Sequence, residues 1–244
     1  MTVAAREALR LRQGAGARYD APEAPAETLA WARLGTAYFA RVLNDLPDAA
    51  LYEASALPGW TRAHVVAHVG YNARALVRLV EWARTGEATP MYASTTQRNA
   101  EIERGSTLPA QALRHLATHA AVHLDVEWRD LPGAAWAAQV VTAQGRTVPV
   151  SETAWMRTRE VWVHAVDLAD VSRGVAPSFA DVPTEVLEHL RDDILGTWAR
   201  RGEPVDVSGV RGALPDLVRW LTGRGRSRLT TTDGDPVPEL PRWL

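Results

Sequence analysis

Glu160 and His164 are the residues of this chain whose types and spacing most clearly suggest chemistry. They lie four positions apart in the run Arg157–His164 of a predicted helix, so both side chains leave the same face about 40° from each other. A carboxylate and an imidazole in this arrangement can share one divalent metal ion, which needs a third ligand from another element. The pair therefore predicts two ligands of a metal site.

A second predicted helix, with Thr61 as its N-cap, offers the third ligand. His68 lies within the apolar stripe of this helix, about 60° from its centre, whereas His64 falls about 100° away on the flank. An imidazole that points inward needs a partner. The set His68, Glu160 and His164 would leave coordination positions open, which is typical of a reactive rather than a structural metal.

Each of these residues also has a structural interpretation. A single inward histidine such as His68 most often hydrogen-bonds within the core. The helix that carries Glu160 is apolar on both sides, which predicts burial, and a buried glutamate is costly unless it is paired or bound to metal. A histidine, Arg157 or Arg159 could supply that pair, and the metal hypothesis competes with a Glu–His or Glu–Arg ion pair.

The remaining histidines fit a metal site less well. His115, His119 and His123 form a row at helical spacing, but the row lies off the apolar centre of its helix and its ends are about 12 Å apart. One ion cannot reach all three, so they predict a solvated face. His189 has no evident partner in the sequence.

Arginine must provide any anion binding, because the sequence contains no lysine. Arg98 follows a hydroxyl-rich run at the start of a short polar helix. Arg224, Arg226 and Arg228 lie in a glycine-broken loop that could close over a substrate carboxylate. Spacing alone does not choose among these arginines, and most arginines are simply solvated.

The composition limits the class of protein. With 27 basic and 29 acidic residues intermixed, the net charge of −2 indicates neither a nucleic-acid partner nor an anionic membrane surface. No apolar run reaches the ~18 residues of a membrane span, and the N-terminus lacks the apolar stretch of a signal peptide, so we expect the cytoplasm. Cysteine is absent, so a thiol reaction would need a thiol from outside.

The periodicity predicts an α+β protein. Residues 25–172 suggest an antiparallel four-helix bundle, preceded by a weakly ordered lead-in (1–24), and residues 178–244 suggest a small α/β domain. The expected helices are 27–43, Thr61 to Gly86, 94–104, Pro109 to about 129, Ser151 to about Gly174, 183–200 and 214–221. The expected strands flank Gln144-Gly145 and lie near 205–208 and 229–232.

Several motifs together resemble the mycothiol-dependent maleylpyruvate isomerase family. They are Gly59-Trp60-Thr-Arg with Val65-Val-Ala-His68, Pro90-Met-Tyr-Ala-Ser with Arg98, Arg157-Thr-Arg-Glu160-Val-Trp-Val-His164, and the ending from Trp220 to Leu244. The resemblance covers the chain from about residue 25.

This resemblance implies a DinB-like four-helix bundle followed by a small α/β domain. It implies zinc or another divalent metal at His68, Glu160 and His164, and catalytic arginines that bind substrate at Arg98 and Arg224. The family reaction converts maleylpyruvate to fumarylpyruvate in gentisate breakdown, with mycothiol as the thiol cofactor.

The residues suit this reaction. Cis–trans isomerisation of a conjugated diacid needs a nucleophile that adds reversibly, permits rotation and leaves. A thiolate does this, and a metal ion lowers a bound thiol's pKa. The expected partners are therefore a small diacid substrate and a low-molecular-weight thiol. Two alternatives remain, a mycothiol S-transferase acting on another electrophile and a non-catalytic bundle that binds metal or ligand; the sequence is compatible with a monomer but sets no oligomeric state.

Overall fold

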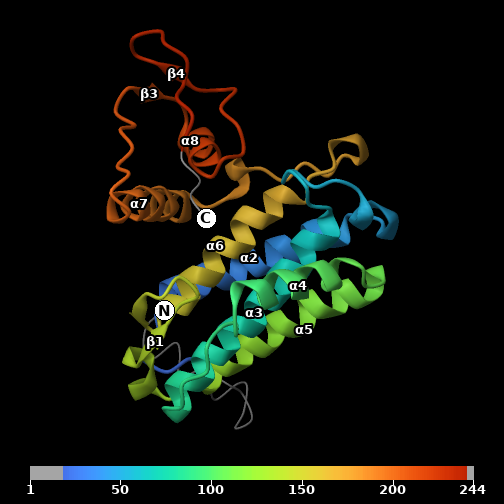
Figure 1. The fold of residues 1–244 in the computed structure, drawn as a ribbon, viewed down its shortest axis with the longest axis vertical. Helices are drawn as coiled ribbons and strands as arrows, with labels where there is room; N and C mark the ends of the chain where they lie inside the picture. The colour runs from blue at the N-terminus through green and yellow to red at the C-terminus, as the bar shows by residue number, and fades with distance from the viewer. Residues whose placement is uncertain (1–18, 241–244) are drawn as a thin grey trace, which may run out of the picture.

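The computed structural model describes residues 19–240 and places most of them in helices (Figure 1). Short antiparallel strand pairs accompany the helices, which confirms the expected α+β class. The helices are α2 (Ala26–Asn44), α3 (Arg62–Thr85), α4 (Thr95–Ser106), α5 (Ala110–Asp130), α6 (Glu152–Asp167), α7 (Thr184–Arg200) and α8 (Leu214–Leu221). The strands are β1 (Gln139–Val141), β2 (Thr147–Pro149), β3 (Val210–Arg211) and β4 (Thr230–Thr231).

Four long helices lie alongside one another. The closest partners are α2 with α6 and α3 with α5, and α3 also packs against α6. By contrast, α2 and α5 contact each other sparsely. One hydrophobic cluster joins α2, α3 and α6 to α7 and α8, so the C-terminal helices share their core with the long helices.

Local sequence signals explain the limits of α3. The Thr61 hydroxyl accepts a hydrogen bond from the backbone N–H of His64, and the His64 ring accepts one from the backbone N–H of Thr61. This reciprocal capping satisfies two N–H groups that a helix start leaves free. At the other end Gly86 adopts a left-handed conformation with φ of 79°, which glycine tolerates best. Both predicted ends of this helix are confirmed.

The predicted end of α6 near Gly174 is wrong, because the helix stops at Asp167. The buried guanidinium of Arg62 donates to the backbone carbonyls of Leu168 and Ala169 at 2.7–3.1 Å. Carbonyls at a helix end have no partner within the helix. Arg62 on α3 supplies those partners and favours the end of α6 at this position.

The C-terminal elements lie together on one side of the long helices, beside α6 (Figure 1). Both predicted helices, α7 and α8, are confirmed, and β4 lies within the predicted 229–232 run. The strand expected at 205–208 is wrong, since the paired strand is β3 and begins at Val210. The Asp206 carboxylate accepts from the backbone N–H of Ser208, which turns the chain before β3.

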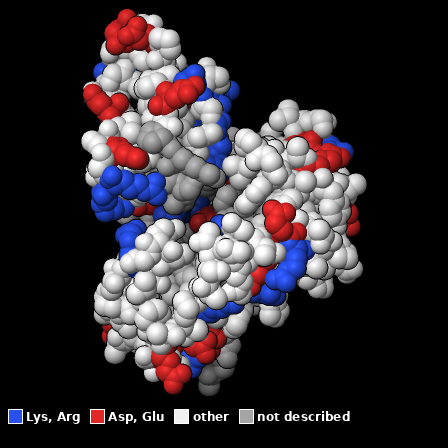
Figure 2. Space-filling model, viewed as in Figure 1, with Lys and Arg blue, Asp and Glu red and all other residues white. Residues whose placement is uncertain are grey.

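The surface carries charges of both signs. On the face drawn in Figure 2, arginines and acidic residues are interspersed rather than gathered by sign. None of the described helices combines the length and apolar character that a bilayer span requires. Of the lead-in expected at 1–24, residues 1–18 lie outside the described residues, while Asp20 forms an ion pair with Arg33 at 2.6 Å.

Candidate metal centre

Three side chains from two helices converge on one point between α3 and α6. The Nε2 atom of His68 lies 2.9 Å from Oε2 of Glu160, and Nε2 of His164 lies 3.5 Å from the same oxygen. One ligand atom from each residue falls within 4.8 Å of the others. The structure therefore brings together the three residues that helical spacing selected.

The walls around these residues are partly aromatic. Trp60 meets the His68 ring edge-on at 5.6 Å between centroids, and the rings of His68 and His164 are nearly perpendicular at 4.8 Å. The side chains of His68, Glu160 and His164 are 7%, 11% and 15% exposed. They are largely shielded from bulk water, yet each keeps a small exposed fraction.

The electrostatics favour a charged carboxylate in this cluster. Burial alone would raise the pKa of Glu160, but hydrogen bonds and charge interactions with His164 and His68 outweigh it and hold that pKa well below its usual range. Burial lowers the pKa of His68, which favours the neutral imidazole. Burial would also lower the pKa of His164, but the interactions with Asp167 and Glu160 outweigh it and raise that pKa. A divalent metal binds a carboxylate and neutral imidazoles, so metal binding at His164 would release a proton.

Asp167 contacts the ring nitrogen of His164 that faces away from Glu160, and the sequence analysis did not identify this contact. Its Oδ2 lies 2.8 Å from Nδ1 of His164, and its side chain is completely buried. An imidazole that donates through Nδ1 presents its Nε2 lone pair to a metal. The signal was available, since Asp167 lies three positions after His164 and thus on the same helix face.

Arg224 completes this chain of contacts. Its Nε and Nη2 atoms donate to the two carboxylate oxygens of Asp167 at 3.0 and 2.6 Å. Burial would raise the pKa of Asp167, but the interactions with His164 and Arg224 outweigh it and lower that pKa. Of the three arginines in its loop, Arg224 contacts the cluster, whereas Arg226 donates to the carbonyl of Val237 and Arg228 is exposed.

Arg98 reaches the opposite side of the cluster from α4. Its Nη2 lies 3.3 Å from Nδ1 of His68, and its guanidinium lies 5.8 Å from the centre of the Tyr92 ring. No carboxylate among the described residues forms an ion pair with Arg98. Its guanidinium is half-buried beside the site and can bind an anion.

The other histidines behave largely as the sequence indicates. His115, His119 and His123 are exposed, as expected for a solvated face. His64 lies near the exposed Glu103, with 3.3 Å between Nε2 and Oε2. His189, for which the sequence showed no partner, packs against Trp155 and Trp31, so its role is packing between rings.

Of the competing ion pairs for Glu160, the structure forms the one with histidine, to His68 at 2.9 Å and His164 at 3.5 Å, and not one with an arginine among the described residues. Arg159 instead binds Asp193 at 3.0 Å, and Arg157 donates to the carbonyl of Val69 at 2.8 Å. Glu160 therefore has two histidines as its hydrogen-bonding partners, and two imidazoles with one carboxylate make up a donor set that fits a divalent metal.

The helices and the His/Glu/His cluster together define the class of protein: an α+β protein with a candidate open metal centre. The family described as the mycothiol maleylpyruvate isomerase N-terminal domain matches residues 32–169. The crystal structure of the mycothiol-dependent maleylpyruvate isomerase is similar with a TM-score of 0.83 and 45% sequence identity, over 89% of this chain and 96% of that one. A mutant of that enzyme gives the same values.

No curated protein matches the chain. The family match and the 45% identity over most of both chains are sufficient to assign the family. This chain belongs to the mycothiol-dependent maleylpyruvate isomerase family.

Proposed function

We propose that this protein is a mycothiol-dependent cis–trans isomerase that converts maleylpyruvate to fumarylpyruvate. The observation that carries the proposal is the convergence of His68, Glu160 and His164 in a chain 45% identical to an enzyme of that activity. The chain has no cysteine, so the reaction requires a thiol from outside, which mycothiol supplies. The reaction would be a step of gentisate breakdown and would take place in the cytoplasm.

The three convergent residues would hold a divalent ion, for which we propose zinc. When bound, the ion lowers the pKa of a coordinated thiol and so makes a nucleophile available near neutral pH. The contact between Nδ1 of His164 and Asp167 would keep the proton on Nδ1 and leave Nε2 to hold the ion. Glu160 supplies the negative charge that its low pKa preserves.

Arg98 would bind a carboxylate of the substrate. If Nε2 of His68 held the ion, the ring would carry its proton on Nδ1 and would no longer accept a hydrogen bond from Arg98. Nη2 could then bind an anion next to the metal, while Nη1 donates to Oδ1 of Asn99 at 3.1 Å. Arginine suits a diacid because its planar fork matches a carboxylate with two hydrogen bonds.

Arg224, which the resemblance matched to a second substrate arginine, has a different role in this proposal. Its guanidinium is already bound to both oxygens of Asp167, and breaking that contact would leave a fully buried carboxylate with His164 as its one remaining ion-pair partner among the described residues. We therefore assign Arg224 as a positioning residue that acts on His164 through Asp167.

For the architecture, we propose that residues 25–172 form a DinB-like antiparallel four-helix bundle and residues 178–244 a small α/β domain. Arg224 lies in the second segment and Asp167 in the first, so their ion pair links the two segments at the metal centre. The C-terminal segment would thereby contribute directly to the geometry of the site.

The test is spectrophotometric loss of maleylpyruvate with metal-loaded protein, with and without mycothiol. We expect turnover only with the thiol. Turnover at full rate by protein stripped of small molecules would contradict the thiol mechanism. Thiol-dependent consumption of another electrophile without isomerisation would instead identify an S-transferase, and no thiol-dependent reaction would indicate a binding protein.

A further inference from the structure

A cavity of about 320 Å³ opens between α2 and α5, two long helices that contact each other sparsely. The walls of this cavity are mostly apolar and include the buried side chains of Phe39, Leu43, Leu124 and Trp128. Val122 at its rim is 58% exposed. His68, Glu160 and His164 do not line this cavity, so it is separate from the metal centre.

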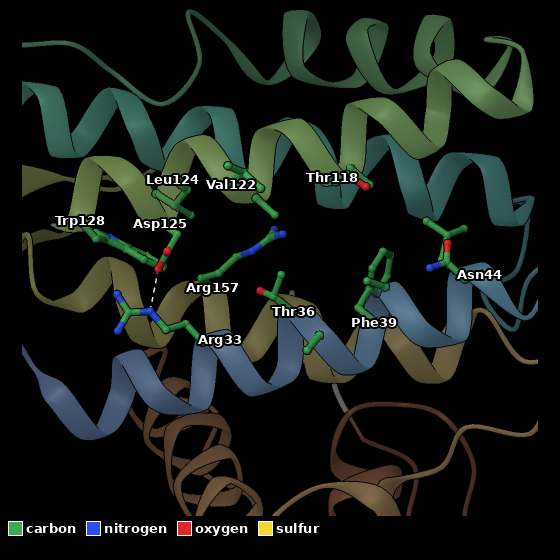
Figure 3. A pocket seen from close by; sticks show the side chains of 15 residues that line it. Arg33, Thr36, Phe39, Asn44, Thr118, Val122, Leu124, Asp125, Trp128 and Arg157 are labelled. Atoms are coloured by element: carbon green, nitrogen blue, oxygen red, sulfur yellow. Dashed lines mark hydrogen bonds and ion pairs between the residues drawn. The ribbon is translucent and has the colours of Figure 1, made fainter. Parts of the chain in front are cut away.

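Arg157 reaches into this space from α6, between the two helices (Figure 3). Its side chain is only 2% exposed. Nη1 donates to the carbonyl of Val69 at 2.8 Å and lies 3.4 Å from Oδ1 of Asn72. Nε is buried and has no hydrogen-bond partner among the described residues. The guanidinium therefore keeps unused donor capacity beside an apolar cavity.

The positive charge of Arg157 lacks a direct counter-ion in the described part of the chain. Glu160, one turn further on, favours the charged form through space but is hydrogen-bonded to histidines. Burial lowers the pKa of Arg157 to about 10, which still leaves it charged at neutral pH. A buried charge without a counter-ion is unfavourable even when it is partly hydrogen-bonded, so an anion entering the cavity would gain a strong interaction.

The other charges at the cavity are already paired. Arg33 at one end binds Asp125 and Asp20, each at 2.6 Å (Figure 3 draws the Asp125 contact). An incoming anion would therefore be drawn to Arg157 rather than to Arg33. The volume lies at the lower end of the range for small-molecule sites, and the apolar walls favour a ligand with a hydrocarbon or aromatic body.

We propose that the cavity between α2 and α5 is a second binding site, for a small amphiphilic carboxylate. The apolar body of the ligand lies against Phe39, Leu43 and Trp128, and its carboxylate accepts hydrogen bonds from Arg157. This site takes a monoanion with an apolar tail, which differs from the diacid proposed for the metal centre.

Calorimetric titration of the whole protein with octanoate, octanol and octylamine tests this assignment. We expect octanoate to bind one per chain, at least about tenfold more tightly than octanol or octylamine, since a hydrogen bond to a charged group is worth about 1.5–3 kcal/mol. Equal binding of all three compounds, or no saturable octanoate binding, would overturn the proposal.

Two variants locate the site. Ala37→Trp fills the cavity from its exposed α2 wall and should abolish octanoate binding, whereas Ala30→Trp, an exposed α2 position outside the cavity, should retain it. Arg157→Met should remove the preference for octanoate over octanol. If Arg157→Met does not fold, the Ala37/Ala30 pair still decides the question. Octanoate binding that survives Ala37→Trp would place the ligand elsewhere, such as the metal centre, and would overturn the proposal.

Discussion

Glu160 and Arg157 are buried charged residues three positions apart on α6, and they differ sharply in how many of their polar atoms have partners. Glu160 is surrounded by partners: two histidines contact it, and one of them is held by Asp167 and Arg224. Arg157 is buried at least as deeply, yet it has one short contact to a backbone carbonyl and an unsatisfied Nε. One helix therefore carries a fully connected polar network and an incomplete one.

This difference predicts that the Glu160 network binds a cation and that Arg157 binds an anion. A connected network holds its donor atoms in fixed positions and binds a cation without rearrangement, because each ligand is oriented by a second contact. A buried cation without a counter-ion, such as Arg157, is only partly stabilised by its contacts to Val69 and Asn72, and its remaining donors favour an anion. The two regions thus predict opposite responses to substitution, which the following experiments measure.

The largest effect is expected at the metal centre itself. His68→Ala removes a ligand, so elemental analysis should show most of the metal lost. Activity should fall more than about 100-fold, because the loss of a residue that only orients a metal ligand already costs up to about 100-fold. His119→Ala, on the exposed row, should keep both metal and activity. A full metal complement in His68→Ala would show that the cluster is not a metal site.

The next effect should come from the contacts behind His164. Asp167→Asn keeps the side-chain size but removes the charge, and metal affinity measured against a competing chelator should fall about 10–100-fold. Arg224→Ala should weaken metal affinity in the same direction, while Arg228→Ala in the same loop should not. Unchanged metal affinity with a raised KM in Arg224→Ala would return Arg224 to the substrate-binding role.

Arg98 should separate substrate binding from metal binding. Arg98→Ala is expected to cost about 1.5–3 kcal/mol in kcat/KM, the scale of hydrogen bonds to a charged group, with metal content and melting temperature unchanged. Arg104→Ala, an exposed arginine on the same helix, is the matched control. A large loss of melting temperature with normal activity would instead make Arg98 structural.

Helix faces and caps could be predicted from the sequence because they depend on local spacing. The inward face of α3, the N-cap at Thr61 and the stop at Gly86 follow from residues within a few positions of each other. The end of α6 could not be predicted, since Arg62, about one hundred positions earlier, binds its last carbonyls. Long-range capping leaves no local pattern.

The same limit applies to the site. The three convergent residues were predicted because two share a helix face and the third lies on an inward stripe. The Asp167–Arg224 ion pair joins segments 57 positions apart, so the sequence identified an arginine-rich loop but not which arginine contacts the cluster, nor through which carboxylate. Arg157 was weighed only as a partner for Glu160, because an unfilled cavity between helices has no signature in the sequence.

The smallest effect is expected for Arg157, and a second buried arginine makes the comparison quantitative. Arg157→Met loses about one net hydrogen bond, worth about 1 kcal/mol, and no longer buries an unpaired charge, so the free energy of unfolding should change by less than about 1 kcal/mol. Arg62 is similarly buried, but its guanidinium donates to three backbone carbonyls, those of Ala50, Leu168 and Ala169.

Arg62→Met leaves those carbonyls without their donor and should cost at least about 2 kcal/mol. Urea unfolding of both variants measures the two free energies under one set of conditions. If Arg157→Met destabilises the fold as much as Arg62→Met does, then the Arg157 guanidinium is a structural group. If Arg157→Met is nearly neutral while Arg62→Met is not, the fold does not require this buried charge, and the reason for keeping it lies in what the cavity binds.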